Sequence, residues 1–189
     1  MNILCEQDCI RLDNLLGDIS ADLTMYKQLY MQKDSLEILN GTGAMVFSRL
    51  QVHLLNASYL SISKLLDPAR TRKNKNFSFL YFIEKAGLDD DQEVNELLER
   101  AVKVYEESEL KNYRNKVLAH NDYRSVSNSP FYPFQIETMS TMLDILWKLW
   151  CLIQYRSGRK DSVVDMGLDV ILPGDICGSS LLHKLRERT

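Results

Sequence analysis

The segment that decides the fold class is IETMSTMLDILWKLWCLI, residues 136–153. Its apolar residues recur at steps of three and four positions, the spacing of a helix, and they cover more than one face. A helix of this kind is buried on several sides, so we expect it at the centre of a helical bundle or in a subunit interface. Pro133 suits the first position of this helix, which we expect to run to Gly158.

Apolar residues at helical spacing predict further helices in the preceding part of the chain. The first is expected to end at Asn40–Gly41, because glycine is a common helix stop, and the second before Pro68, which cannot continue a helix. Gly87 closes a short third helix, and Asp89, Asp90 and Asp91 supply an N-cap and a favourable negative charge for the start of a fourth. In order, the expected helices occupy residues 12–40, 44–66, 77–86, 92–118 (with a kink or a new cap at 107–109) and 136–158.

The fold class that follows is all-α: an antiparallel, up-and-down bundle of about five helices with an irregular C-terminal tail. We expect the bundle to span residues 1–157, with a loop at residues 121–130 where the helical pattern breaks. In the tail, residues 158–189, glycines and a proline interrupt the apolar residues. This predicts irregular structure or a short strand pair, followed by a short helix over residues 179–188.

The composition is that of an ordinary folded protein with one domain. The chain has 189 residues, enough to bury a core without disulfides or metals, and 45% of them are apolar. Because no apolar run is long enough to cross a membrane and the first residues lack the pattern of a signal peptide, we expect a cytoplasmic protein. The net charge of −3 argues against a protein that coats nucleic acid without specificity, but it allows a local basic patch.

The four cysteines lack the paired spacing of a zinc site, and we expect no metal to bind them. In a reducing compartment they are expected to be free thiols, partly buried. They are Cys5, Cys9, Cys151 and Cys177.

The polar segment YRNKVLAHND, residues 113–122, is the candidate functional site. It holds Arg114, the amide of Asn115 and His120 close together, near the expected end of a long helix. Histidine has the side-chain pKa nearest to neutral, and an arginine guanidinium stabilises charge on a phosphate. With a neighbouring amide, these two groups have the chemistry to cleave RNA without a metal ion.

Arg114 and His120 do not meet within one straight helix. The six-residue step separates them by about 120° around the helix axis and roughly 9 Å along it. They reach one phosphate if the helix ends before His120, or if a second copy of the chain completes the site across a two-fold axis. We favour the dimer, in which both copies supply residues to a composite active site.

This segment resembles the signature of HEPN domains, in which an arginine and a polar residue are followed, after a short spacer, by a histidine. Arg114, Asn115 and His120 match these positions. Together with the upstream segment LSISKLLDP, residues 60–68, it is most similar to the AbiU-type abortive-infection branch. The resemblance extends from the second expected helix to the fifth, and the C-terminal tail is not part of it.

The resemblance implies a metal-independent endoribonuclease that needs no cofactor and acts as a homodimer, either as an antitoxin-controlled toxin or in antiphage defence. By this comparison, His120 is the general base or acid for the ribose 2′-hydroxyl or the leaving 5′-oxygen. Arg114 stabilises charge on the phosphorus, Asn115 orients a group by hydrogen bonding, and a cyclic phosphate is left. Asp122 either orients His120 or serves the helix end, and Tyr113 is a supporting residue.

A basic segment between the second and third helices is the candidate for holding the RNA backbone. Residues 70–76 are polar and basic, and with Lys116 and Arg124 they form the expected RNA-binding set. The alternative is a solvated loop without a ligand. The cations of this segment are Arg70, Arg72, Lys73 and Lys75.

The motif residues also have structural interpretations. His120 can cap a helix C-terminus as a cation, and Asn115 can have a purely structural role. Arg114 can form a surface ion pair, for which Glu107 and Asp122 are the expected partners.

Two other functions compete with the ribonuclease. The first is a non-catalytic helical module for dimerisation or partner-protein binding, in which the motif is buried or ion-paired. The second, a nucleotide-binding or regulatory domain, is disfavoured because the sequence has no glycine-rich phosphate loop and no acidic metal cluster. His53 and His183 lie outside any cluster, so we expect neither to be catalytic. Aromatic residues at core spacing are expected to pack rather than to stack on bases: Tyr59, Tyr81, Tyr105, Trp147 and Trp150.

Overall fold

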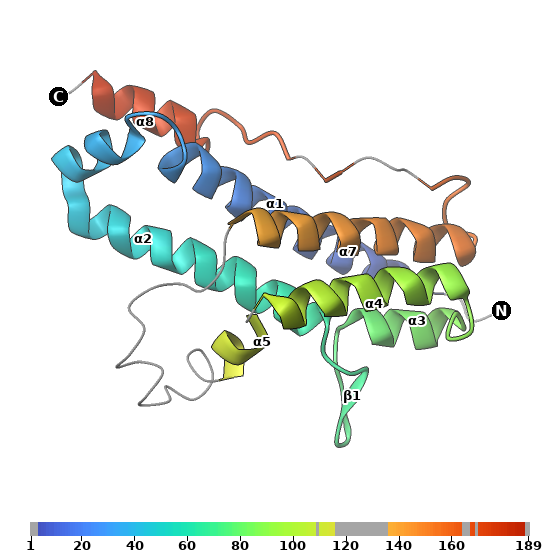
Figure 1. Cartoon of the computed structure of the whole chain (residues 1–189). Helices are drawn as coiled ribbons and strands as arrows, with labels where there is room; N and C mark the ends of the chain where they lie inside the picture. The colour runs from blue at the N-terminus through green and yellow to red at the C-terminus, as the bar shows by residue number, and fades with distance from the viewer. Residues whose placement is uncertain (1–3, 109, 116–135, 164–166, 169, 188–189) are drawn as a thin grey trace.

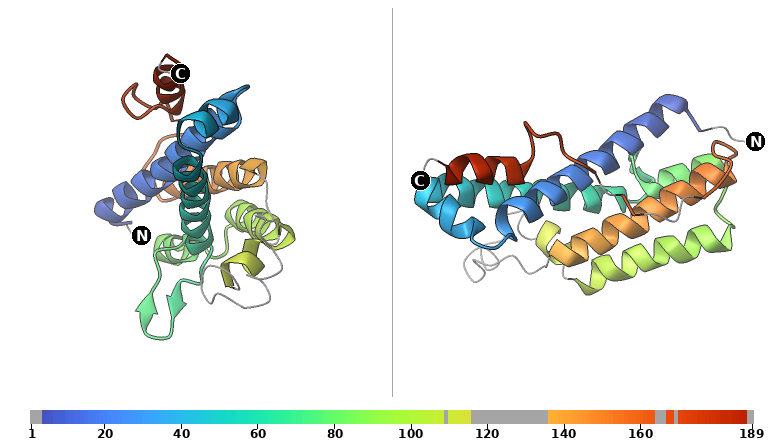
Figure 2. Two further views of the ribbon diagram at one scale, coloured as in Figure 1. Left: turned by 90° about the vertical axis from the view of Figure 1, so that its left-hand side faces the viewer. Right: turned by 90° about the horizontal axis from the view of Figure 1, so that it is seen from above.

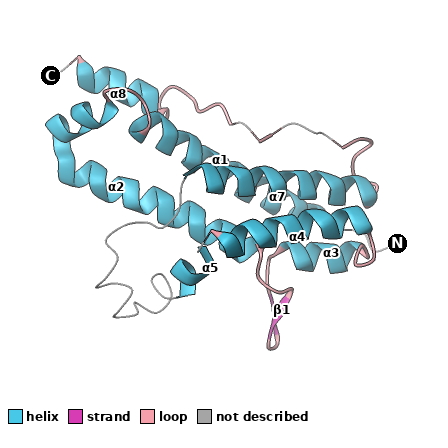
Figure 3. Ribbon diagram, in the orientation of Figure 1, coloured by secondary structure: helices cyan, strands magenta, loops and turns pink. Residues whose placement is uncertain are grey.

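The computed structural model describes residues 4–108, 110–115, 136–163, 167–168 and 170–187. Within them the fold is an all-α bundle with one small hairpin, which confirms the predicted fold class (Figure 1, Figure 3). No described helix is long and apolar enough to span a bilayer. The helices are α1 (Glu6–Tyr30), α2 (Ser35–Leu65), α3 (Phe79–Ala86), α4 (Gln92–Glu107), α5 (Leu110–Tyr113), α7 (Ile136–Arg156) and α8 (Gly178–Arg186). The hairpin strands are β1 (Arg70–Thr71) and β2 (Asn74–Lys75).

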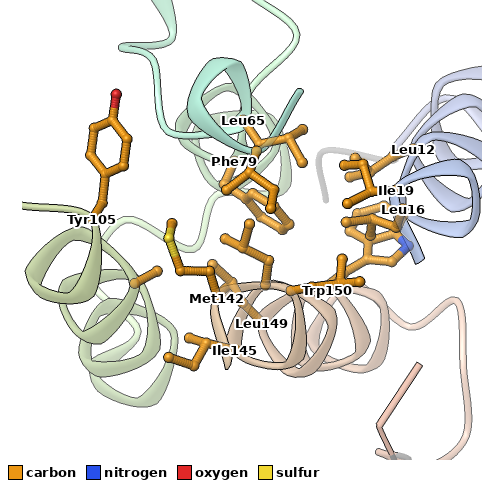
Figure 4. Close-up of a cluster of buried hydrophobic side chains, with 14 of the residues drawn as sticks. Leu12, Leu16, Ile19, Leu65, Phe79, Tyr105, Met142, Ile145, Leu149 and Trp150 are labelled. Atoms are coloured by element: carbon orange, nitrogen blue, oxygen red, sulfur yellow. The ribbon is translucent and has the colours of Figure 1, made fainter. Parts of the chain in front are cut away.

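Helix α7 is the buried centre of the bundle. It packs against α1, α2, α3 and α4, and the view from above in Figure 2 shows it between α1 and α4. In Figure 4, Trp150 of α7 lies against Leu16 of α1. Burial of a large apolar side chain contributes about 1.5–3 kcal/mol, so the several buried faces of α7 are the main reason for the bundle. Its buried residues are Ile136, Met139, Met142, Leu143, Ile145, Leu146, Leu149, Trp150, Cys151, Leu152, Ile153 and Gln154.

The boundary between the first two helices differs from the prediction. The sequence predicts a first helix that ends at Asn40–Gly41, but α1 ends at Tyr30 and α2 begins at Ser35. Residues 40 and 41 lie inside α2 and do not end a helix. Nearby, Gly43 kinks α2, because its φ of −175° and ψ of 63° are not helical. The early turn is stabilised by packing: Leu29 and Leu39 belong to one buried cluster, whereas in a continuous helix they would lie roughly 15 Å apart along the axis.

Several other described helix ends carry a local signal in the sequence, although α1 begins at Glu6 and α3 at Phe79 rather than at the expected residues 12 and 77. α2 stops at Leu65, before Pro68. α3 begins after Ser78 and α4 after Asp91, and each of these side chains accepts a hydrogen bond from a backbone amide of the first helical turn. α3 ends at Gly87, whose φ of 69° lies in the left-handed region that favours glycine.

The basic segment, residues 70–76, is a hairpin and not the predicted loop. β1 and β2 pair antiparallel over two residues each. Asn76 closes the hairpin, because its Nδ2 donates to the Pro68 carbonyl at 2.7 Å and to the Thr71 hydroxyl at 2.8 Å. Strands of two residues are too short to produce an alternating pattern, so the sequence carries no strand signal here.

The C-terminal tail returns to the other helices. Its described residues between α7 and α8 contain no strand, and α8 confirms the predicted terminal helix. α8 packs against α1 and α2, where Leu182 joins Leu29 and Leu39 in a buried apolar cluster. The division into a bundle, residues 1–157, and a separate tail, residues 158–189, stays a prediction.

The start of α8 offers a test of this docking. A Cβ at Gly178 would lie 2.9 Å from Leu29 Cγ and 3.2 Å from the Met25 carbonyl oxygen. We expect Gly178→Ala to lower the free energy of unfolding by about 1–3 kcal/mol, because α8 must shift to relieve the overlap. The control is Gly174→Ala, since a Cβ there meets nothing within 4 Å. Urea unfolding measures both variants, and equal stabilities would contradict the close packing of α8.

Candidate functional site

The described part of the candidate site is built on one ion pair, between Arg114 and Asp67. Arg114 Nη1 donates to Asp67 Oδ1 at 2.7 Å, and Nη2 donates to Oδ2 at 2.9 Å. The two side chains are 28% and 23% exposed, so the pair lies at the edge of the bundle rather than in free solvent. A two-pronged pair of this kind is geometrically specific. Its hydrogen bonds raise the pKa of Arg114, which keeps the guanidinium charged.

The pair joins the two sequence segments that carry the resemblance. Asp67 lies just after the end of α2, within residues 60–68, and Arg114 lies just after α5. Residues 114 and 115 form a wider, π-type helical turn, a feature often found at functional sites. The expected surface ion pair of Arg114 is present with Asp67, because the fold brings the end of α2 to α5. Of the two expected partners, Glu107 pairs with Lys103, and Asp122 lies outside the described residues.

Tyr113 secures the backbone next to Arg114. Its hydroxyl donates to Asn56 Oδ1 of α2 at 3.0 Å. Its ring packs edge-on against Tyr59, with the ring centroids 5.6 Å apart and an interplanar angle of 74°. Both contacts tie the start of the motif to α2, which supports the role of Tyr113 as a supporting residue.

Two buried tyrosines lie behind the ion pair. Tyr59 is 0% and Tyr105 6% exposed, which confirms that both pack in the core. Burial and, next, the nearby Tyr105 raise the pKa of Tyr59, while Arg114 lowers it. Arg114 therefore lies near two buried tyrosines, and the end of its guanidinium faces Asp67. The sequence did not predict Asp67, Tyr59 or Tyr105 as neighbours of Arg114. The signal for one of them was the segment at residues 60–68, in which Asp67 precedes the proline after α2.

The remaining motif residues divide into those the structure describes and those it does not. Asn115 is described, and it is exposed. His120, Lys116, Asp122 and Arg124 lie outside the described residues, as do the predicted loop at 121–130 and Pro133. The separation of Arg114 from His120 and the composite active site therefore stay predictions.

The basic hairpin adjoins the ion pair. Arg70 follows Asp67 by three residues, so their backbones lie at most about 11 Å apart. The four hairpin cations are all exposed. Arg70 Nη2 makes a loose surface pair with Glu84 Oε2, at 3.7 Å. A cavity of about 180 Å³ lies between the hairpin and α3. Its lining residues are Arg70, Lys75, Tyr81, Glu84 and Lys85.

Comparison with protein families identifies the chain. The family model HEPN_AbiU2, described as AbiU2, matches residues 10–163. The chain belongs to the AbiU2 family of HEPN domains. The match confirms the resemblance and begins within α1, earlier than the motifs alone indicated. Comparisons with curated proteins and with solved structures found no match.

Other features of this AbiU2-family chain lie apart from the ion pair. A larger cavity of about 450 Å³ is lined by residues of α4, α7 and the tail, and none of them belongs to the motif. Within the described residues no group of three or more acidic, histidine or cysteine side chains is placed to hold a metal ion. His53 is exposed. His183 lies on α8, and its Nε2 is 3.4 Å from Oε1 of Glu187, the residue after that helix. All four cysteines are free, with Cys9 and Cys151 buried, as predicted.

The contact between Tyr113 and Asn56 can be tested directly. Tyr113→Phe removes one hydroxyl and keeps the ring against Tyr59. We expect the free energy of unfolding to fall by about 0.5–1.5 kcal/mol, because Asn56 loses its hydrogen-bond donor. Tyr155→Phe is the matched control, since Tyr155 is 39% exposed at the end of α7. Urea unfolding that shows the same stability for both variants would argue against the contact.

Proposed function

We propose that this AbiU2-family chain is a metal-independent endoribonuclease that acts in abortive infection, as a toxin or an antiphage effector. The observation that carries the proposal is the family match over residues 10–163 together with the position of Arg114. This arginine is charged, partly exposed and next to a basic hairpin. RNA in the cytoplasm is the proposed substrate, and the active form is a homodimer that an antitoxin or another defence protein controls.

In the proposed reaction a ribose 2′-hydroxyl attacks the adjacent phosphorus. His120 takes the proton of the 2′-hydroxyl as general base, and a histidine in its protonated form, from the same or the other copy, gives a proton to the leaving 5′-oxygen. Arg114 stabilises the charge that develops on the phosphorus, and Asn115 orients a reacting group. The new bond closes a 2′,3′-cyclic phosphate, and the broken bond frees a 5′-hydroxyl end. DNA lacks the attacking hydroxyl and does not react.

Cleavage is the direct test. We expect the purified protein to cleave single-stranded RNA in the presence of a chelator and to leave cyclic phosphate ends. His120→Ala should lower the rate by about 100–10,000-fold, because the general base is lost. Arg114→Ala should lower it by about 100–1,000-fold, because charge on the phosphorus is less stabilised. Gel analysis of end-labelled RNA and of an all-deoxy analogue measures the rates and the products.

The control for these variants is His183→Ala, since His183 is exposed on α8, a helix that carries no residue of the motif. It should cleave RNA at the rate of the unmodified protein. Cleavage that survives in both motif variants, or that requires a metal ion, would contradict the proposed mechanism.

The hairpin cations are proposed to hold the RNA backbone, together with Lys116 and Arg124. We expect the double variant Arg72→Gln, Lys73→Gln to weaken RNA binding, because each lost phosphate contact removes counterion release. The slope of log affinity against log salt should fall by about 0.7 per lost contact on single strands. Fluorescence anisotropy with labelled RNA at several salt concentrations measures both effects.

A charge-matched control keeps this test specific. Lys27→Gln, Lys103→Gln removes the same charge from exposed positions on α1 and α4. An equal loss of affinity in both double variants would show a non-specific effect of net charge and would argue against the hairpin as the binding element.

One observation favours the alternative of a non-catalytic module. Both Nη atoms of Arg114 donate to Asp67, and an ion-paired motif is what that alternative predicts. The two functions differ in their outcome: a dimer in analytical ultracentrifugation that leaves RNA intact in the assay above would favour the non-catalytic module.

A further inference from the structure

The ion pair with Asp67 engages one end of the Arg114 guanidinium. A guanidinium has five N–H donors in a planar fork. Asp67 receives one hydrogen bond from each Nη atom, at 2.7 and 2.9 Å. This end-on contact leaves the Nε–H and the outer N–H of each Nη outside the pair. The side edge of the fork, made by Nε and one Nη, has the geometry that binds two oxygens of a phosphate.

Asp67 is itself held in place. Its backbone amide donates to the Lys64 carbonyl at 3.1 Å, which fixes it to the last turn of α2. Pro68 follows it and restricts its backbone. On the other side of the pair, the hydrogen bond from Tyr113 to Asn56 ties the residue before Arg114 to the same helix. The orientation of the guanidinium is thus set from α2 at two points.

We propose that Asp67 is a positioning residue for catalysis: its carboxylate holds the end of the Arg114 guanidinium so that the side edge faces the phosphate to be cleaved. The inference rests on the proposed ribonuclease function. Asp67 acts through Arg114 and does not touch the substrate. Without the carboxylate, the arginine remains charged but samples several rotamers, and a misplacement of about 1 Å lowers a rate by as much as about 100-fold.

A rival use of the same contact makes the opposite prediction. If Asp67 occupied the place of the substrate phosphate, it would be an inhibitory latch, and its removal would speed cleavage. The end-on geometry favours positioning, because a phosphate can approach the side edge while the pair stays intact. The arginine side chain is 28% exposed, which leaves part of it open to a ligand.

The test compares the unmodified protein with Asp67→Asn, Arg114→Lys and the double variant. Single-turnover cleavage of labelled RNA in chelator gives the rate, and anisotropy with a 2′-O-methyl RNA, which cannot be cleaved, gives the affinity. We expect Asp67→Asn to lower the rate by about 10–100-fold and to change the affinity by less than about threefold. In the Arg114→Lys background, which lacks the planar fork, Asp67→Asn should change the rate by less than about threefold.

Glu93→Gln is the control, because Glu93 is an exposed carboxylate that also pairs with an arginine, Arg156, at 2.8 Å. It should leave the rate and the affinity unchanged. Thermal unfolding shows whether each variant is folded at the assay temperature.

Four outcomes overturn the proposal. The first is a cleavage rate for Asp67→Asn equal to that of the unmodified protein. The second is a higher cleavage rate for Asp67→Asn, which would show that Asp67 is an inhibitory latch. The third is an equal loss from Asp67→Asn in the unmodified and the Arg114→Lys backgrounds, which shows a general structural effect. The fourth is that the unmodified protein cleaves no RNA. Of these four outcomes, this is the one that overturns the proposed ribonuclease function as well.

Discussion

A helix that is apolar on several faces is stable in water only when other elements surround it, and α7 imposes this condition on the whole chain. α1, α2, α3 and α4 all pack against it. Trp150 is 0% exposed, and its indole N–H donates to Asp13 Oδ1 of α1 at 2.6 Å. A polar group buried in this way needs a partner, and this contact links α1 to α7. The positions of α2 and α4 follow from the same core.

This packing is also what brings the functional candidates together. Asp67 and Arg114 are 47 positions apart in the chain, and they meet because α2 and α5 end at the same side of the bundle. The basic hairpin starts three residues after Asp67, so its exposed cations are carried to the same place. This nearness along the chain is why the hairpin and Arg114 are considered together in the proposed function.

The sequence was informative wherever a local signal has one structural meaning. Pro68, Gly87 and the acidic residues 89–91 marked helix ends, because proline geometry, left-handed backbone and caps depend on neighbouring residues alone. The glycines at residues 41 and 43 were ambiguous, because a glycine can end a helix or bend it, and only packing between α1 and α2 decided that the chain turns at residues 31–34. In the site, Arg114 and Tyr113 could be selected from the motif. The partner of Arg114 could not, since every nearby acid in the sequence was an equally good candidate.

The sequence by itself determined the all-α class, the central helix and the family, because these depend on periodicity and on residues in a short segment. Only the tertiary structure decided that Arg114 is held by Asp67 and lies near the buried Tyr59 and Tyr105. The physical reason is that an ion pair needs two groups within a few ångströms in a defined orientation, and that distance is set by how helices pack. The periodicity of apolar residues shows which face of a helix is buried. It does not show which residues of another helix that face contacts.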